Sequence, residues 1–325
     1  MTNKSKTNKI TFSEAFSVIA SVFLFVLLMK NAKLVSVETA NALKRCATLL
    51  IPSLFPLTVA SELATATGAV EKLTKGFESI ISKILGIKKS AVAPYFLGTL
   101  GGYTSSCKST ITLFQNGKIN EDDCESVIAI SNMPSLAFLT SFVGTETLQN
   151  TTDGWILWGI TVFSTFILSF FNRIWSKKHP SRSTVKANYY NLKEKKKFSR
   201  IVVDAVSHST QAMLIICGFV VFFSVLIRVL DITLLRFETP PEARKILLGA
   251  LEITYGVASC KVITNELLKR VLCAFFIGWS GLCVHFQVIA LCEKVNFSFK
   301  RYFLLKFLQG IICALLTFAV FSFKF

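Results

Sequence analysis

The sequence consists of long apolar runs separated by short, mostly basic connections. Of its 325 residues, 52% are hydrophobic and only 17% are charged. This composition is too apolar for an ordinary soluble domain, and runs of about 20 apolar residues have the length of a membrane-crossing helix. Only helices and closed barrels satisfy their backbone polar groups inside a bilayer. We therefore predict an all-α polytopic membrane protein.

Several apolar runs are interrupted by residues that end or bend a helix. Breaks are expected at 101–103, 131–134 and 278–281, each of which contains glycine or proline. Pro52 and Pro56 predict a further break or kink in the run 46–70. The pattern predicts about six full spans and two re-entrant helical hairpins with broken helices.

The two halves of the chain share a phrase. Residues 103–108 read YTSSCK and residues 255–261 read YGVASCK, and a break comes after each phrase at a similar distance. Internal duplication is common among membrane transporters. We therefore predict two inverted repeats within five units: 1–45 (N-terminal helix and link), 46–144 (first repeat core), 145–200 (connecting helix and basic loop), 201–292 (second repeat core) and 293–325 (C-terminal helix).

The net charge of +17 carries information about topology. Lysine and arginine gather in the connections 71–90 and 176–200, as expected of cytoplasmic loops, rather than along a nucleic-acid-binding face. We expect a multi-pass protein of the cell membrane. In the second half, one link is predicted to lie outside the membrane and should therefore contain few lysines and arginines. Its basic residues do not follow this expectation: Arg236, Arg244, Lys245, Lys269 and Arg270.

Lys108 and Lys261 are the leading candidates for a binding site. Inverted repeats would bring both lysines toward the bilayer centre, where a charge costs about 2.5–3.5 kcal/mol and usually has a function. With nearby helix N-termini, they predict a site for a small carboxylate-bearing anion. The alternative is that each lysine caps a short helix and reaches the membrane surface. The other candidate substrate-binding residues are Tyr103, Ser105, Ser106, Tyr255, Ser259, Ser131, Asn132 and Gln287.

Polar residues near these candidates have two interpretations. Glu62 and Glu252 are either coupling carboxylates or counter-ions, with Lys261 as the expected partner of Glu252. Ser131 and Asn132 either orient a substrate or satisfy the backbone opened by Pro134. His285 and Gln287 either line the cavity or form polar contacts between helices.

Catalytic and metal-binding signatures are absent from the sequence. The nine cysteines contain no CxxC pair, and there is no phosphate-binding Walker loop and no HExxH motif. We expect no enzymatic activity, no metal site, no cofactor and no nucleic-acid partner. The expected partners are the lipid bilayer and a small anionic solute, and the sequence leaves open whether copies of the chain associate.

Five separated motifs carry a family resemblance. They are PSLFP at 52–56, GGY at 101–103 with Lys108 beyond it, SNMP at 131–134, LEITYG at 251–256 and GLCVHFQ at 281–287. Together they resemble the YlbJ-type sporulation integral membrane proteins, which are grouped with nucleoside-recognition, or gate-domain, membrane proteins. One departure is that the family's Gly-Tyr-Pro-x-Gly-Ala-Lys reads GYTSSCK at 102–108.

The resemblance implies a role in sporulation, with dipicolinate as the transported solute and a forespore membrane as one option for the location. Nucleoside or nucleobase transport is the alternative that the gate-domain grouping suggests. A non-transporting scaffold for spore-envelope assembly is a third, and it predicts that both lysines can be replaced without loss of function.

Overall fold

Helices are the only regular secondary structure in this computed structural model, which describes residues 12–178, 197–235, 237–293, 295 and 298–323. In chain order they are α1 (Phe12–Lys30), α2 (Ala32–Arg45), η1 (Cys46–Leu50), α3 (Ile51–Ala66), α4 (Ala69–Thr74), α5 (Glu78–Leu85), η2 (Lys89–Ala91), α6 (Val92–Gly101), α7 (Tyr103–Gln115), α8 (Glu121–Ser131), η3 (Phe138–Thr147), α9 (Thr151–Lys178), α10 (Phe198–Leu235), α11 (Pro241–Gly249), α12 (Ile253–Ser259), η4 (Cys260–Val262), α13 (Glu266–Trp279), α14 (Gly281–Leu291) and α15 (Phe299–Ser322). The all-helical class agrees with the prediction. Part of the predicted basic loop 176–200 lies outside the described residues.

Among the described residues, five helical segments are long and apolar enough to cross a membrane. They are Ala32–Ala66, Thr151–Trp175, Phe198–Leu235, Glu266–Leu291 and Phe299–Ser322. The predicted first span corresponds to the shorter α1. The apolar run 127–143, which contains the predicted break at 131–134, is divided between α8 and η3. The chain is therefore a polytopic helical protein, while the repeat relation and the number of spans stay predictions.

The predicted break near Pro52 and Pro56 is absent. α2, η1 and α3 are continuous in the chain without a gap, and η1 is a π-helical stretch directly before Pro52. The Ser53 hydroxyl donates a hydrogen bond of 2.7 Å to the Leu49 carbonyl. The helix therefore continues past both prolines, with a π-turn directly before the first of them.

The three predicted interruptions at 101–103, 131–134 and 278–281 are present. Gly102 has φ of 90° between α6 and α7, and a Cβ there would lie 3.1 Å from the Ser135 nitrogen. After α8 the chain turns extended at Asn132, and Ser280 takes a left-handed φ of 70° between α13 and α14. Glycine suits the first position because it has no side chain to clash there.

The second hairpin consists of α11 and α12. Gly256 lies so close to α11 that an added Cβ would be 2.8 Å from the Gly249 carbonyl oxygen. The two short helices therefore approach more closely than larger residues would permit. In the chain order of each half, a hairpin precedes a broken helix and a long apolar helix.

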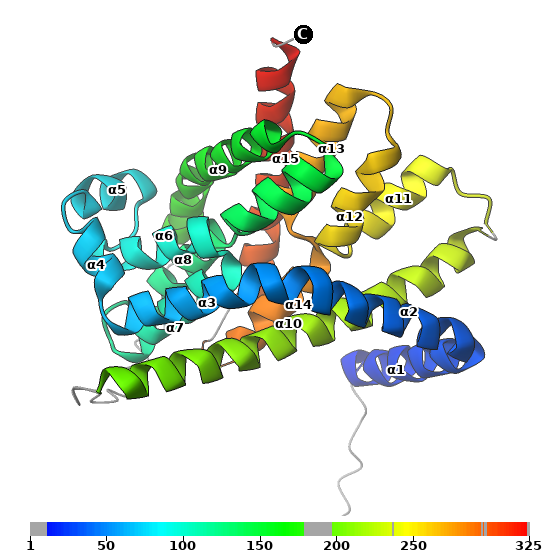
Figure 1. Ribbon diagram of the computed structural model, residues 1–325, viewed down its shortest axis with the longest axis horizontal. Coiled ribbons are helices and arrows are strands. Elements are labelled where there is room, and N and C mark those ends of the chain that lie inside the picture. The colour runs from blue at the N-terminus through cyan, green and yellow to red at the C-terminus, as the bar shows by residue number, and fades with distance from the viewer. Residues whose placement is uncertain (1–11, 179–196, 236, 294, 296–297, 324–325) are drawn as a thin grey trace, which may run out of the picture.

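α10 lies along the helix formed by α2 and α3 and runs in the opposite direction (Figure 1). Arg45, early in that helix, contacts Ser224, whereas Glu62, near its end, contacts His208. An antiparallel crossing is compatible with inverted repeats, but it also occurs between neighbouring helices without such a relation. A small apolar cluster, including Leu50 and Val220, seals the crossing and also contacts Cys283 of α14.

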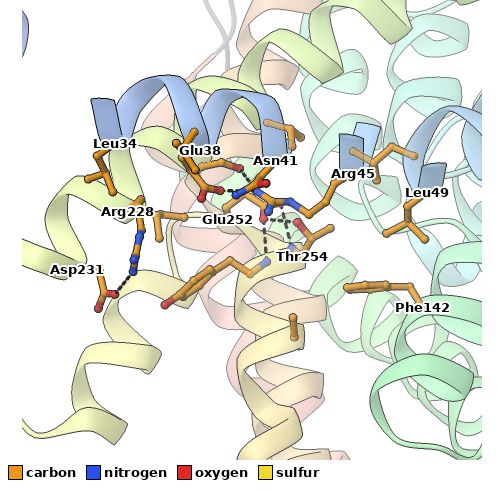
Figure 2. A pocket seen from close by; sticks show the side chains of 17 residues that line it. Leu34, Glu38, Asn41, Arg45, Leu49, Phe142, Arg228, Asp231, Glu252 and Thr254 are labelled. Atoms are coloured by element: carbon orange, nitrogen blue, oxygen red, sulfur yellow. Dashed lines mark hydrogen bonds and ion pairs between the residues drawn. The ribbon is translucent and has the colours of Figure 1, made fainter. Parts of the chain in front are cut away.

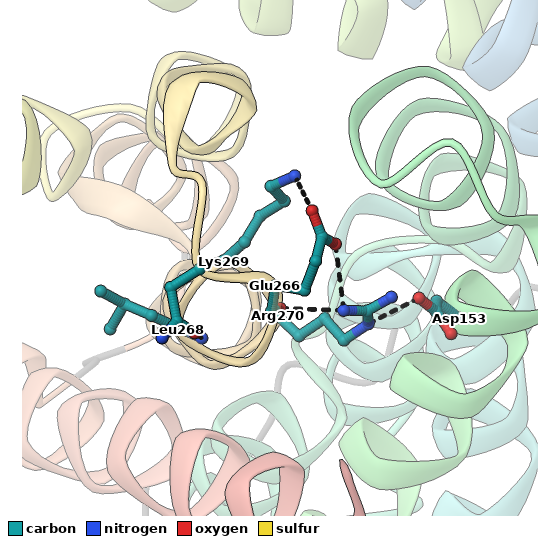
Figure 3. A network of polar contacts seen from close by, with 6 residues as sticks. Asp153, Glu266, Leu268, Lys269 and Arg270 are labelled. Carbon is teal, nitrogen blue, oxygen red and sulfur yellow. Dashed lines mark hydrogen bonds and ion pairs between the residues drawn. The ribbon is translucent and has the colours of Figure 1, made fainter. Parts of the chain in front are cut away.

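The larger apolar core joins α5 through α9 with α12 through α15. Buried ionic networks lie at both ends of this helix group. At one end, Arg270 of α13 donates to Asp153 of α9 at 2.7 Å and to Glu266 at 3.1 Å (Figure 3). At the other end, Arg301 of α15 donates to Glu125 of α8 at 3.2 Å and to Asn172 of α9 at 2.7 Å.

Three basic residues of the link predicted to lie outside form ion pairs in the structure. Arg270 and Lys269 pair with acids in the first network, and Arg244 pairs with Asp231 at 2.8 Å. Because the positive-inside rule counts lysine and arginine rather than net charge, these residues still run against the predicted orientation. Arg236 lies outside the described residues.

Candidate functional site

A small pocket lies where the helix breaks of both halves meet. It has a volume of about 40 Å³ and is lined by Tyr103, Pro134, Glu252, Ser280 and Gln287, among other residues. Four separate interruptions of the helices thus converge on one point. At roughly 10–15 Å³ for each water, a pocket of this volume holds only a few water molecules in this conformation.

Hydrogen bonds tie the two halves together at this pocket. The Tyr103 hydroxyl, at the start of α7, donates to the Gln287 side-chain oxygen of α14. Glu252 caps α12, because its carboxylate accepts hydrogen bonds from the Thr254 and Tyr255 amides at 3.0 and 2.8 Å. The N-terminus of α12 is therefore occupied by a carboxylate of the protein itself.

A large cavity of about 460 Å³, shown in Figure 2, lies beside the small pocket. The two share Leu50, Val220, Glu252 and Thr254 as lining residues. The polar side chains of the large cavity are Glu38, Asn41, Arg45, Ser224, Arg228, Asp231, Glu252, Thr254 and Tyr255. Its volume is in the range of sites that hold small organic molecules. It lies between α2 and the second half of α10, with α12 forming a further wall.

The charges of the large cavity are arranged with the cations outermost. The Arg45 side chain is 46% exposed, whereas Glu38, its partner at 2.8 Å, is only 17% exposed. Arg228 is 48% exposed and its partner Asp231, at 3.4 Å, is 17% exposed. Arg45 uses the same terminal nitrogen to bond Glu38 and Ser224. An arginine has five N–H donors, so both guanidinium groups retain donors for a ligand.

The structure does not bring Lys108 and Lys261 together. Lys108 is part of α7 and its ammonium lies 3.4 Å from Glu62 and 2.6 Å from the His208 carbonyl oxygen. Lys261 lies on η4, beyond the end of α12, and is exposed. Glu62 thus has the expected counter-ion role toward Lys108, whereas Glu252 caps α12 instead of pairing with Lys261.

The other predicted site residues divide between the pockets and the helix contacts. Tyr103, Gln287 and Tyr255 line a pocket. Ser106 and Ser131 share a hydrogen bond between α7 and α8, and the Ser259 hydroxyl donates to the Gly256 carbonyl. The remaining side chains are internal as well: the Ser105 hydroxyl is buried, and Asn132 donates to the Tyr302 hydroxyl. The Tyr302 hydroxyl also lies 3.3 Å from Nδ1 of His285. His285 therefore takes part in a contact between helices and lines neither pocket.

Sequence reasoning missed three charged residues that the structure makes prominent. Arg45 and Arg228 line the large cavity, and Lys306 is completely buried in α15. Arg228 and Lys306 each interrupt a predicted apolar run, which is the same signal that singled out Lys108. Arg45 directly precedes such a run, and no local pattern sets it apart from neighbouring Lys44.

Comparison with known proteins supports the family resemblance. No family model matches the sequence, and no solved structure matches it. Among curated proteins, it is similar to sporulation integral membrane protein YlbJ of Bacillus subtilis (strain 168), with 26% identity over 298 residues. The similarity covers 82% of this chain and 72% of that relative. Together with the apolar helices, this similarity shows a multi-pass integral membrane protein that resembles the YlbJ-type sporulation family.

Proposed function

We propose that this protein transports a small carboxylate-bearing anion across the membrane, with dipicolinate as the solute during endospore formation. One observation carries the proposal: Arg45 and Arg228 present exposed guanidinium groups to the large cavity while their acidic partners are mostly buried. Two such groups can each form charge-assisted hydrogen bonds to a carboxylate. The cavity replaces the lysine pair as the proposed anion site.

The arrangement of the helices supports transport rather than a static binding role. The large cavity ends at Glu252 and Thr254, which also line the small pocket at the helix breaks. Broken helices at the midplane are typical of secondary transporters, where one group of helices moves against another. We propose that the helices on either side of the large cavity are these two groups. The protein would act without a cofactor and without enzymatic chemistry.

Binding can be tested on the purified protein in detergent by its thermal unfolding. Dipicolinate should raise the melting temperature, because a ligand at 100 times its Kd stabilises the folded state by about 2.7 kcal/mol. Uridine serves as the matched probe for the nucleoside alternative. Stabilisation by uridine alone would favour nucleoside transport, and no response to either would favour the scaffold.

A further inference from the structure

Lys306 is a membrane-buried lysine surrounded by uncharged oxygen atoms. It lies in α15 and is 0% exposed. Its ammonium nitrogen donates to the backbone carbonyl of Asn132 and to the side-chain oxygen of Gln309, each at 2.5 Å. Gln309 in turn donates to the Ser164 hydroxyl of α9 at 3.1 Å. Lys306 therefore joins α15 to the break after α8.

Among the described residues, no carboxylate forms an ion pair with Lys306. Its electrostatic neighbours that can titrate are His285 on α14 and Cys313 on α15, and α8 and α9 offer the neutral Asn132 and Ser164. Tyr302, also on α15, lies between Asn132 and His285.

The charged groups of the helices packed on α15 lie toward its ends. Glu125 of α8 pairs with Arg301, and Asp153 of α9 pairs with Arg270 of α13, whose guanidinium lies over the ring of Phe321. Both carboxylates are therefore held by arginines. Lys306 lies between these two networks and is completely buried, without an acid as an ion-pair partner among the described residues.

This environment accommodates both protonation states of the amine. An ammonium ion without a counter-ion is costly inside a membrane, so such a group is seldom retained without a function. A neutral amine still has two N–H groups, enough for the Asn132 carbonyl and the Gln309 oxygen. It would lose only the third donor and the charge. Lys306 can therefore bind or release a proton without leaving a partner unsatisfied.

The contact with Asn132 connects Lys306 to the small pocket. The Asn132 carbonyl lies at the break after α8, and the next residues of that break, Pro134 and Ser135, line the pocket. Two buried polar atoms near it, the Asn132 side-chain oxygen and Nε2 of His285, form no hydrogen bond within the described part of the chain. A change in the charge of Lys306 acts directly on the backbone that shapes the pocket.

We propose that Lys306 carries the coupling proton of the transport cycle. This inference rests on the proposed function and names its energy source. A proton from water on one side of the membrane adds to the Nζ lone pair, and the same proton leaves to water on the other side after the helices rearrange. One proton crosses in each cycle, no group is oxidised or reduced, and sodium is not required.

The test uses full-length protein in proteoliposomes with labelled dipicolinate. One assay measures exchange of internal for external dipicolinate at equal pH, and the other measures accumulation under a pH gradient of either direction. The variant is Lys306→Met, which keeps the length of the side chain and removes the proton site. Lys300→Met is the matched control, because Lys300 is exposed at the start of the same helix.

Wild type and Lys300→Met should exchange dipicolinate and accumulate it up to about tenfold per unit of pH difference for one proton. Lys306→Met should still exchange it but show no accumulation under the gradient. Accumulation by Lys306→Met equal to wild type, or accumulation by wild type under a sodium gradient and not a pH gradient, would overturn the inference alone. Absence of dipicolinate exchange by the wild-type protein would overturn both the inference about Lys306 and the proposed function.

Folding of the variant is checked separately. If Lys306→Met does not exchange the solute, Lys306→Gln is the second variant, because its amide can still donate to the Asn132 carbonyl. If neither variant exchanges the solute, coupling of the wild-type protein to a sodium gradient and not to a pH gradient still overturns the inference.

Discussion

Replacing Arg270 by methionine should lower the free energy of unfolding by about 3–5 kcal/mol, because Asp153 would remain buried without its cation. Their side chains are only 9% and 4% exposed, and the bond between them is 2.7 Å long. Removing one partner of a buried ion pair leaves an uncompensated charge, which costs far more than the pair contributes. Thermal or denaturant unfolding in detergent measures the loss.

Lys269→Met is the matched control for this variant. Lys269 is the adjacent residue and is 13% exposed, but its partner Glu266 is 51% exposed and also pairs with Arg270. Loss of Lys269 therefore leaves no buried charge without a partner and should cost about 1 kcal/mol. The double variant Arg270→Met/Asp153→Leu should recover part of the stability, since no buried charge is then left over. Equal stability of Arg270→Met and Lys269→Met would show that the network in Figure 3 contributes little.

Replacing Arg45 or Arg228 by glutamine should raise the KM for dipicolinate about tenfold or more. A hydrogen bond to a charged group contributes about 1.5–3 kcal/mol, and 1.4 kcal/mol corresponds to a factor of ten. The double variant should have the larger defect while the protein level stays near normal, because both side chains are nearly half exposed. Initial rates of uptake over a range of solute concentrations separate KM from the maximal rate.

Lys44→Gln provides the control for charge alone. Lys44 is the exposed neighbour of Arg45 and does not line the cavity, so its KM should match that of wild type. If Arg45→Gln and Lys44→Gln behave alike, the large cavity is not the site of anion binding.

The helix breaks were predictable from sequence because their causes are local. Gly102 and Pro134 cannot continue an α-helix at low cost, and each break lies where these residues predict it. Pro52 shows the limit of such reasoning: whether a proline breaks a helix depends on how neighbouring groups satisfy the backbone. Here the helix continues through a π-turn before Pro52, and the Ser53 hydroxyl donates to the Leu49 carbonyl within it.

The duplicated phrase predicted more similarity than the structure contains. Lys108 lies within the 13-residue helix α7, whereas α12 ends after seven residues and Lys261 lies on a separate turn beyond it. The same residue types therefore have different local geometry in the two halves. A shared sequence pattern could not reveal this, because the length of each helix also depends on the residues C-terminal to the phrase.

The large cavity depends on contacts between distant segments, which a single sequence does not specify. Arg45 and Ser224 meet only because α10 crosses α2 and α3 in the antiparallel direction. Lys306 is the opposite case, since a lysine within an apolar run is visible in the sequence. Its partners on α8 and α9, however, are known only from the packing.

The most direct test of the transport proposal is uptake of labelled dipicolinate into proteoliposomes that contain the purified wild-type protein, beside vesicles with Arg45→Gln/Arg228→Gln. We expect saturable uptake by wild type and a strongly reduced rate for the double variant at the same solute concentration. Uptake of uridine but not dipicolinate, or no uptake of either by wild type, would contradict the assignment of this protein as an anion transporter.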